Sequence, residues 1–342
     1  MSKIFNISQR RYLGNKNSIL PFIENIITNE IGEFYSFCDI FAGTGVVGSY
    51  FNRDDNKIIS NDLLYHNFIS LNTFLSSEKF DKDKLERILD NLNNPHKVDS
   101  NYFDKHFGDR YFTLDNAKKI GYIREEIKRL FLNNKIDRRE KDILITSLIY
   151  SIDKIANTVG HYDAYIKKDI KVVDFKLKLP NIDISQNCNN QIFNMDANLL
   201  IRDIECDILY LDPPYNSRQY SDAYHLLENL ALWQKPEVKG VAKKFDRSKI
   251  KSEYCKVNAT KRFEDLIINA KTKYILLSYN NMGKNGASRS NARISDKDIF
   301  RILGLRGTVK VFEQSYKEFN TGKKKRDNNM ERVFFVKVEK DI

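Results

Sequence analysis

A carboxylate and two prolines stand directly after an apolar run in the segment CDILYLDPPYNSRQY, residues 206–220. The apolar residues 208–211 predict a buried strand, which Pro213 and Pro214 end because proline has no N–H for a sheet hydrogen bond. The strand end presents the Asp212 carboxylate, the Pro213 carbonyl and the Tyr215 ring. These groups suit an exocyclic amine on a flat ring, since two acceptors hold its N–H groups and the aromatic face stacks on the ring. We predict a catalytic corner here, against the simpler alternative of an ordinary turn.

A glycine-rich turn, GTGVVG at residues 43–48, follows a second predicted strand and matches the G-x-G-x-x-G pattern. The acid Asp62 ends the next strand, as in a dinucleotide site that holds a pyrophosphate at a helix N-terminus and a ribose on the acid. The same arrangement suits S-adenosylmethionine, which has a ribose and cationic groups but no phosphate. A carboxylate at Asp39 favours the second reading, because it would repel a pyrophosphate and tolerate an ammonium. The predicted cofactor residues of this half are Asp39, Phe41, Gly43, Gly45 and Asp62.

An amine that attacks a sulfonium methyl group needs no prior loss of a proton. Alignment and electrostatics then supply most of the barrier reduction. Asp212 is accordingly interpreted as the group that orients the amine rather than as a strong base.

Strand and helix patterns alternate along most of the chain. Strand-like runs occur at 36–39, 56–62, 191–196, 206–212 and 273–279, and two alternating runs at 308–316 and 331–339 suggest a C-terminal hairpin. Long charged helices occupy the stretch from 75 to about 190. This order predicts a doubly wound, mostly parallel α/β sheet with an antiparallel end. We expect a catalytic core formed by 1–75 and 190–342, and a helical insertion at 76–189.

Positive charge is concentrated in particular segments of a chain with 57 basic and 46 acidic side chains and a net charge of +11. The stretch 239–262 has nine Lys or Arg against two acids, without the apolar stripe of an amphipathic helix. We therefore expect it and the 321–329 segment to contact phosphates. The residues singled out are Lys243, Lys244, Lys323, Lys324, Lys325 and Arg326.

Cysteine use and hydropathy indicate a cytoplasmic protein. The four cysteines stand at no metal or redox spacing, and no window approaches the apolar run of a membrane span. His161 has no cluster of acids or cysteines around it, so we expect no metal site.

Four segments in order resemble the DNA adenine N6-methyltransferases of the Dam-like alpha group. They are RRYLGNKNSILPFI at 10–23, DIFAGTG, the SND that ends at Asp62, and DPPY. The resemblance implies a seven-stranded Rossmann-like methyltransferase sheet and S-adenosylmethionine as cofactor. It also implies that Tyr12 and Lys16 reach the cofactor, and that Asp196 in FNMDA approaches its adenine. Asp212 is implied to lie close to the methionine end of the cofactor. Tyr12 stands where the family often has Trp, and Asn15 where it often has Gly, so the pocket can differ in detail.

The insertion falls where the family keeps its target-recognition region. Within it, ANTVGHYDAYIKK at 156–168 combines small, polar and aromatic residues with lysines. We predict that His161, Tyr162 and Lys167 contact DNA. The implied partner is double-stranded DNA with a flipped target adenine, for a monomeric enzyme that often accompanies a restriction endonuclease.

Several alternatives stay open at the level of the sequence. The same chemistry could act on an RNA adenine, on N4 of cytosine or on a protein glutamine. A protein substrate would offer no phosphates for the clustered lysines to contact. A literal G-x-G-x-x-G match allows a nicotinamide-dependent dehydrogenase. A non-catalytic DNA-binding specificity subunit is the alternative of a different class.

Overall fold

The computed structural model describes residues 5–53, 55–167, 170–279, 292–315 and 330–340. One mixed sheet of seven strands organises a large part of these residues. Across these residues, the strand order is β3-β2-β1-β4-β5-β7-β6. The first five of these strands run parallel, whereas β7 is antiparallel to both β5 and β6. The predicted doubly wound sheet with an antiparallel end is confirmed. The strands are β1 (Ser36–Asp39), β2 (Lys57–Asn61), β3 (Gln191–Phe193), β4 (Glu205–Leu211), β5 (Lys271–Ser278), β6 (Val309–Ser315) and β7 (Met330–Lys337).

Helices cover both faces of this sheet because its strands are apolar on both sides. Phe37 and Cys38, which are neighbours on β1, are both fully buried but belong to different hydrophobic clusters. The cluster that contains Phe37 includes α1 (Leu20–Glu30) and α2 (Val46–Tyr50). The cluster that contains Cys38 includes α8 (Ala197–Leu200), α11 (Ala259–Asn269) and α12 (Asp296–Leu303).

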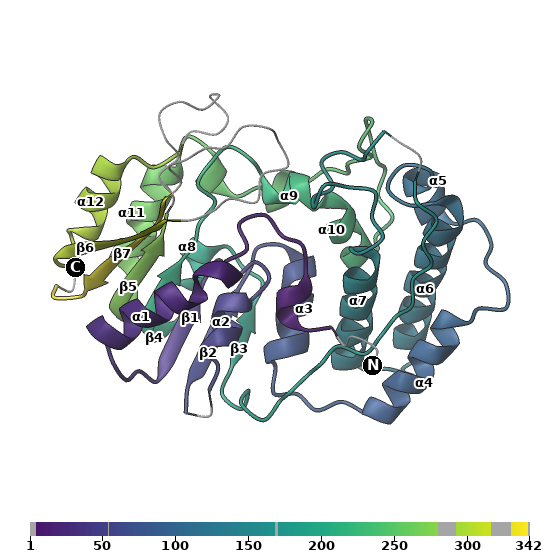
Figure 1. Ribbon diagram of the computed structural model, residues 1–342, viewed down its shortest axis with the longest axis horizontal. Helices are drawn as coiled ribbons and strands as arrows, with labels where there is room; N and C mark the ends of the chain where they lie inside the picture. The colour runs from purple at the N-terminus through teal and green to yellow at the C-terminus, as the bar shows by residue number, and fades with distance from the viewer. Residues whose placement is uncertain (1–4, 54, 168–169, 280–291, 316–329, 341–342) are drawn as a thin grey trace.

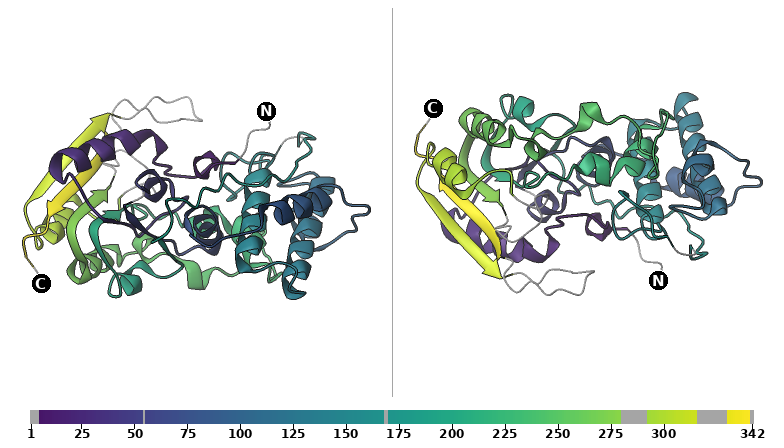
Figure 2. Two further views of the ribbon diagram at one scale, coloured as in Figure 1. Left: turned by 90° about the horizontal axis from the view of Figure 1, so that it is seen from below. Right: turned by 90° about the horizontal axis from the view of Figure 1, so that it is seen from above.

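A second body of helices lies beside the sheet, at the opposite end of the elongated molecule (Figure 1 and Figure 2). The predicted insertion supplies α4 (Lys82–Asn93), α5 (Tyr102–Phe107), α6 (Leu114–Leu132) and α7 (Arg138–Ile152). Their apolar side chains form one cluster with those of α3 (Tyr65–Leu75), α9 (Tyr220–Ala223) and α10 (His225–Leu232). The helical body therefore draws on segments that directly follow the two predicted site motifs.

Short 3-10 turns complete the connections around the pocket. The N-terminal segment contains η1 (Ile7–Gln9) and η2 (Asn17–Ile19), and the long connection from α10 to α11 contains η3 (Ser248–Ile250) and η4 (Glu253–Cys255). None of the helices in the described ranges is long and apolar enough to cross a bilayer.

From β1 the chain adds β2 and β3 on one side of the sheet, and then β4 and β5 on the other side. The strand order therefore reverses between β1 and β4, which are neighbours at the centre of the sheet. In such sheets the crevice at the carboxyl ends of the two central strands is the usual ligand site. Here those ends are Asp39 and Asp212, so both predicted motifs open at the same edge.

Candidate active site

The glycine turn after β1 needs backbone conformations that favour glycine. Gly43 and Gly45 have φ values of +55° and +82°. A Cβ on Gly45 would lie 2.4 Å from Cδ2 of Leu71, and a Cβ on Gly43 would lie 3.1 Å from the Tyr12 ring. The turn is thus packed tightly between the N-terminal segment and α3, which leaves room for glycine only.

Asp62 fastens this turn to the start of α3. Its Oδ2 accepts the Gly43 N–H at 2.9 Å, and its Oδ1 accepts the Leu64 N–H at 2.8 Å. Burial raises the pKa of Asp62 to about 6, against the lowering effect of these backbone donors. Since a carboxylate oxygen can accept two hydrogen bonds, Asp62 keeps acceptor capacity on the pocket side.

Asp212 lies directly after β4, and Lys16 holds its carboxylate. The Lys16 Nζ is 3.0 Å from Oδ2 of Asp212 and 3.3 Å from the Gly14 carbonyl oxygen. Burial raises the pKa of Asp212, and Lys16 opposes that rise. Burial lowers the pKa of Lys16, but Asp212, with smaller contributions from Glu331 and Tyr215, outweighs this effect, so the lysine pKa ends above its ordinary value. The N-terminal segment therefore supplies the counter-ion of the predicted catalytic acid.

Asp39 contributes a second carboxyl group to the same pocket. It is only 1% exposed, and burial raises its pKa to about 8, with a further contribution from the Asp212 charge. The Asp39 side chain is therefore largely protonated at neutral pH in the protein without ligand.

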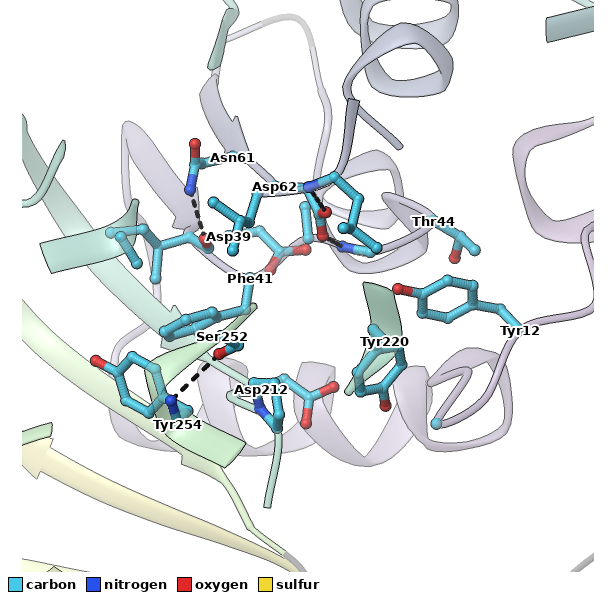
Figure 3. A pocket seen from close by; sticks show the side chains of 18 of the residues that line it. Tyr12, Asp39, Phe41, Thr44, Asn61, Asp62, Asp212, Tyr220, Ser252 and Tyr254 are labelled. Carbon is cyan, nitrogen blue, oxygen red and sulfur yellow. Dashed lines mark hydrogen bonds between the residues drawn. The ribbon is translucent and has the colours of Figure 1, made fainter. Parts of the chain in front are cut away.

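Two aromatic walls face each other across the pocket, with Asp212 between them (Figure 3). One wall is Phe41 with Tyr254, whose rings meet edge to face at 5.0 Å. The other is Tyr12 with Tyr220, whose rings stack at 5.4 Å. Behind this second wall, Tyr224 stacks on Tyr12 at 4.6 Å. The space between the walls has the flat, mostly apolar sides that a purine requires.

Asp196 also lines the pocket, as the N-cap of α8. Its Oδ1 accepts the N–H groups of Asn198 and Leu199 at 3.0 and 3.3 Å. Its side chain therefore has a local structural role besides any contact with a cofactor.

The remaining members of the proline corner are placed differently from one another. Pro214 lines the pocket with Asp212, whereas Pro213 is buried. Tyr215 is partly buried against the sheet-side core, edge to face with Tyr279 at 6.3 Å, and its carbonyl accepts the Arg293 N–H at 2.8 Å. The stacking role of Tyr215 stays a prediction.

The predicted DNA residues of the insertion separate into buried and accessible ones. Tyr162 is fully buried, donates its hydroxyl to Asp153 at 3.0 Å and has no surface for a base or phosphate, so it is a core residue. His161 is half-buried, and burial lowers its pKa. Lys167 is exposed. DNA contact by His161 and Lys167 stays a prediction.

The basic segment 239–262 is partly neutralised by acids from other elements. Lys244 lies 2.9 Å from Asp163, whereas Lys243 is half-buried in a left-handed backbone conformation with φ +53°. Lys323, Lys324, Lys325 and Arg326 lie outside the described residues. Across the described part of the chain, no group of three or more His, Cys, Asp or Glu side chains is placed to hold a metal ion.

Sequence reasoning named Tyr12 but missed three other tyrosines at the walls, Tyr220, Tyr224 and Tyr254. Tyr220 and Tyr224 stand four apart, directly after the proline corner, and this helical spacing was an available signal. Tyr254 is buried within the basic segment, where its lysine neighbours suggested only surface. Its hydroxyl donates to Asn198 Oδ1 at 3.0 Å, a contact between segments that no local pattern shows.

Known proteins resemble this chain over most of its length. It is 34% identical to the modification methylase StsI of Streptococcus sanguinis over 92% of the chain and 50% of that protein. It is 32% identical to the Type II methyltransferase M.FokI of Planomicrobium okeanokoites over 97% of the chain and 53% of that protein. The chain thus spans about half the length of these two relatives. For the Type II methyltransferase M.NlaIII of Neisseria lactamica, identity is 32% over 93% of the chain and 95% of the relative.

The sequence model of one protein family matches residues 12–286. That span contains both motifs, Lys16 and the two aromatic walls, as well as the helical insertion. The family match offers no support for a nicotinamide-dependent dehydrogenase. The chain belongs to the D12 class N6 adenine-specific DNA methyltransferases.

Proposed function

We propose that this chain transfers a methyl group from S-adenosylmethionine to N6 of a flipped-out adenine in double-stranded DNA, as the modification enzyme of a restriction-modification system. The observation that carries the proposal is the Asp212 carboxylate, which pairs with Lys16 and lines the same pocket as the glycine turn. The relatives named modification methylases and Type II methyltransferases support the biological context.

The donor set of the pocket fits S-adenosylmethionine. Asp62 and Asp196 bring two carboxyl groups to its lining, which suits a cofactor with cationic groups and two ribose hydroxyls and opposes one with phosphates. Asp39 adds a third carboxyl group, which is neutral in the protein without ligand. Phe41 and Tyr254 offer aromatic surface to its adenine. When bound, the cofactor supplies an electrophilic methyl group.

The chain's own residues orient the nucleophile. In our proposal the Asp212 carboxylate and the Pro213 carbonyl accept the two N–H groups of the target amine, which directs the nitrogen lone pair out of the ring plane. Lys16 favours the ionised form of Asp212, because its ammonium lies 3.0 Å from that carboxylate. Lys16 thus opposes the effect of burial, which raises the pKa of Asp212.

The helical insertion 76–189 is proposed as the target-recognition region. It packs in one cluster with α9 and α10, which directly follow the proline corner. A monomer with a cognate endonuclease remains the expected assembly.

Methyl transfer to duplex DNA tests the function. With labelled S-adenosylmethionine, we expect N6-methyladenine in the digested product. The variant Asp212→Ala should still bind DNA while its transfer rate falls by about 10²- to 10³-fold or more, because it loses the acceptor that aligns the amine. Structured RNA as competitor separates the two nucleic acids. Label recovered in 5-methylcytosine, or faster transfer to the RNA, would contradict the proposal.

A further inference from the structure

A cluster of ion pairs lies at the rim of the pocket, outside the residues that line it. Asp163 accepts from Arg218 through Nε at 3.1 Å and Nη2 at 2.8 Å, and from Lys244 Nζ at 2.9 Å. Arg218 stands three residues after Tyr215, and the next two residues, Gln219 and Tyr220, line the pocket. The Arg218 backbone is therefore joined directly to the pocket lining through Gln219.

The cations of this cluster outnumber its anions. Asp222 is 2.7 Å from Arg247 Nε and 4.0 Å from Lys244 Nζ. Three cationic side chains thus share the two carboxylates of Asp163 and Asp222. His161, whose Nδ1 is 4.0 Å from Asp163, adds no charge at neutral pH because burial, Arg218 and Lys244 lower its pKa. This cluster of five charged side chains at the rim therefore keeps a net positive charge when both carboxylates are paired.

Both sides of the Asp163–Arg218 pair are fixed by backbone contacts. On one side, the Tyr162 N–H donates to the Ala223 carbonyl at 2.6 Å. On the other, the Arg218 carbonyl accepts from Cys255 Sγ at 3.3 Å, and the Gln219 side chain bonds the backbone of Ser252 in both directions at 2.8 and 2.9 Å. Two anchored loops therefore present one guanidinium in a set position, with its side chain 42% exposed.

We propose that Arg218 binds a backbone phosphate of the DNA strand that delivers the target adenine, and that Asp163 holds the guanidinium at the rim until this phosphate replaces it. The planar fork of arginine matches a phosphate as well as a carboxylate. An exposed ion pair contributes little net free energy, so the exchange of one anion for another is easy. The inference rests on the proposed function, because it requires DNA as substrate.

The test uses variants that are expected to change DNA affinity in opposite directions. Arg218→Ala should weaken binding to a duplex that the wild-type protein methylates and lower the salt slope of binding by about 1, whereas Arg218→Lys should keep most of that slope. Asp163→Asn should tighten DNA binding several-fold, because it removes the competing anion. Affinity for S-adenosylmethionine should be unchanged in all three variants.

The pair Glu264–Arg301 offers a matched control on α11 and α12. Its closest atoms are 2.6 Å apart, and its side chains are 31% and 47% exposed, compared with 26% and 42% for Asp163 and Arg218. Glu264→Gln and Arg301→Ala should leave DNA binding unaltered.

The two proposals fail in distinguishable ways. If the wild-type protein methylates no DNA, the proposed function fails. If it methylates DNA but Asp163→Asn and Arg218→Ala both weaken binding, the pair is only structural and the phosphate assignment is wrong. Unchanged binding in both variants would reject the assignment as well.

Discussion

The two walls of the pocket belong to different hydrophobic cores. Phe41 and Tyr254 pack with the core between the sheet and α8, α11 and α12. Tyr12 and Tyr220 pack against the core of the helical body, and Tyr224 is part of it. The pocket thus lies between two hydrophobic cores. Neither core alone supplies aromatic rings on both sides of the pocket.

The walls also differ in the buried ionisable group that lies near each. On the sheet side, Asp39 is a carboxylic acid whose pKa is raised to about 8. On the helical side, His66 is fully buried, its Nδ1 is 2.7 Å from Glu228, and its pKa is lowered to about 4. Burial keeps both groups neutral at neutral pH, so their contributions to stability should depend on pH in opposite directions.

The contact that joins the two sides should be the most sensitive to mutation. Lys16 comes from the N-terminal segment and Asp212 from the end of β4. Lys16→Met leaves the half-buried Asp212 without its counter-ion, so we expect methyl transfer to fall by about 10²- to 10³-fold. Single-turnover transfer at saturating cofactor measures the loss, with thermal unfolding to verify the fold.

The same strand offers a control for this variant. Lys273 lies 2.7 Å from Asp207 near the beginning of β4, at the opposite edge of the sheet from the pocket. Lys273→Met should leave transfer within about twofold, because Asp207 lies far from the pocket and keeps the N–H groups of Tyr35 and Ser36 as donors. A comparable loss in both variants would show that the Lys16 effect comes from general destabilisation.

The carboxyl groups and the glycine turn on the sheet side of the pocket could be predicted from sequence, whereas the contacts that build the helical side could not. Asp39, the glycine turn and Asp62 follow successive strands, and the strand-end rule alone brings them to one edge. The helical side depends on contacts between distant segments. Arg11 donates its backbone N–H to Asp153, 142 residues away, and Leu13 donates to the Tyr224 hydroxyl, 211 residues away.

The same distinction explains the misplaced DNA residue. Tyr162 has the composition of a surface loop around it, yet Asp153 and Ala223 hold it in the core. A local pattern reports which residues alternate or turn. It does not report which distant acid or carbonyl a tyrosine will meet.

Asp39→Asn should remove a pH dependence of stability on the sheet side. Because the folded pKa of about 8 lies above the ordinary value of 3.8, the folded state binds the extra proton between these values. Stability from this group is therefore complete below about pH 4 and is lost as pH rises through 8. We expect the slope of unfolding free energy to change by up to about 1.4 kcal/mol per pH unit in this window. Denaturant unfolding at several pH values measures it, and an unchanged slope would mean that Asp39 is ionised in the folded protein.

His66→Asn should change the pH dependence of the unfolding free energy in the opposite sense to Asp39→Asn, over a narrower pH range. Burial is the main cause of the low His66 pKa, Arg10 adds to it, and Glu228 opposes it. Between about pH 4 and 6.5 the unfolded chain binds the proton, so stability from neutral His66 is present above 6.5 and lost as pH falls. The variant should lose up to about 1.4 kcal/mol per pH unit of this dependence. The substitution also removes the contact with Glu228, which lowers the unfolding free energy at every pH. The slope of the unfolding free energy against pH still reports the titration of His66.

The smallest expected effect concerns the aromatic contact of the sheet-side wall. Tyr254→Leu removes the ring that meets Phe41 edge to face, and an aromatic pair contributes about 1 kcal/mol beyond burial. We therefore expect the Kd for S-adenosylmethionine to rise about fivefold by calorimetry. Tyr254→Phe keeps the ring and loses only the hydrogen bonds of the hydroxyl to Asn198 and to the Arg262 carbonyl, so its effect should be smaller. Tyr224→Leu alters the helical side behind Tyr12 and should change this Kd less than Tyr254→Leu does. The reverse order would place the cofactor against the helical-side wall instead.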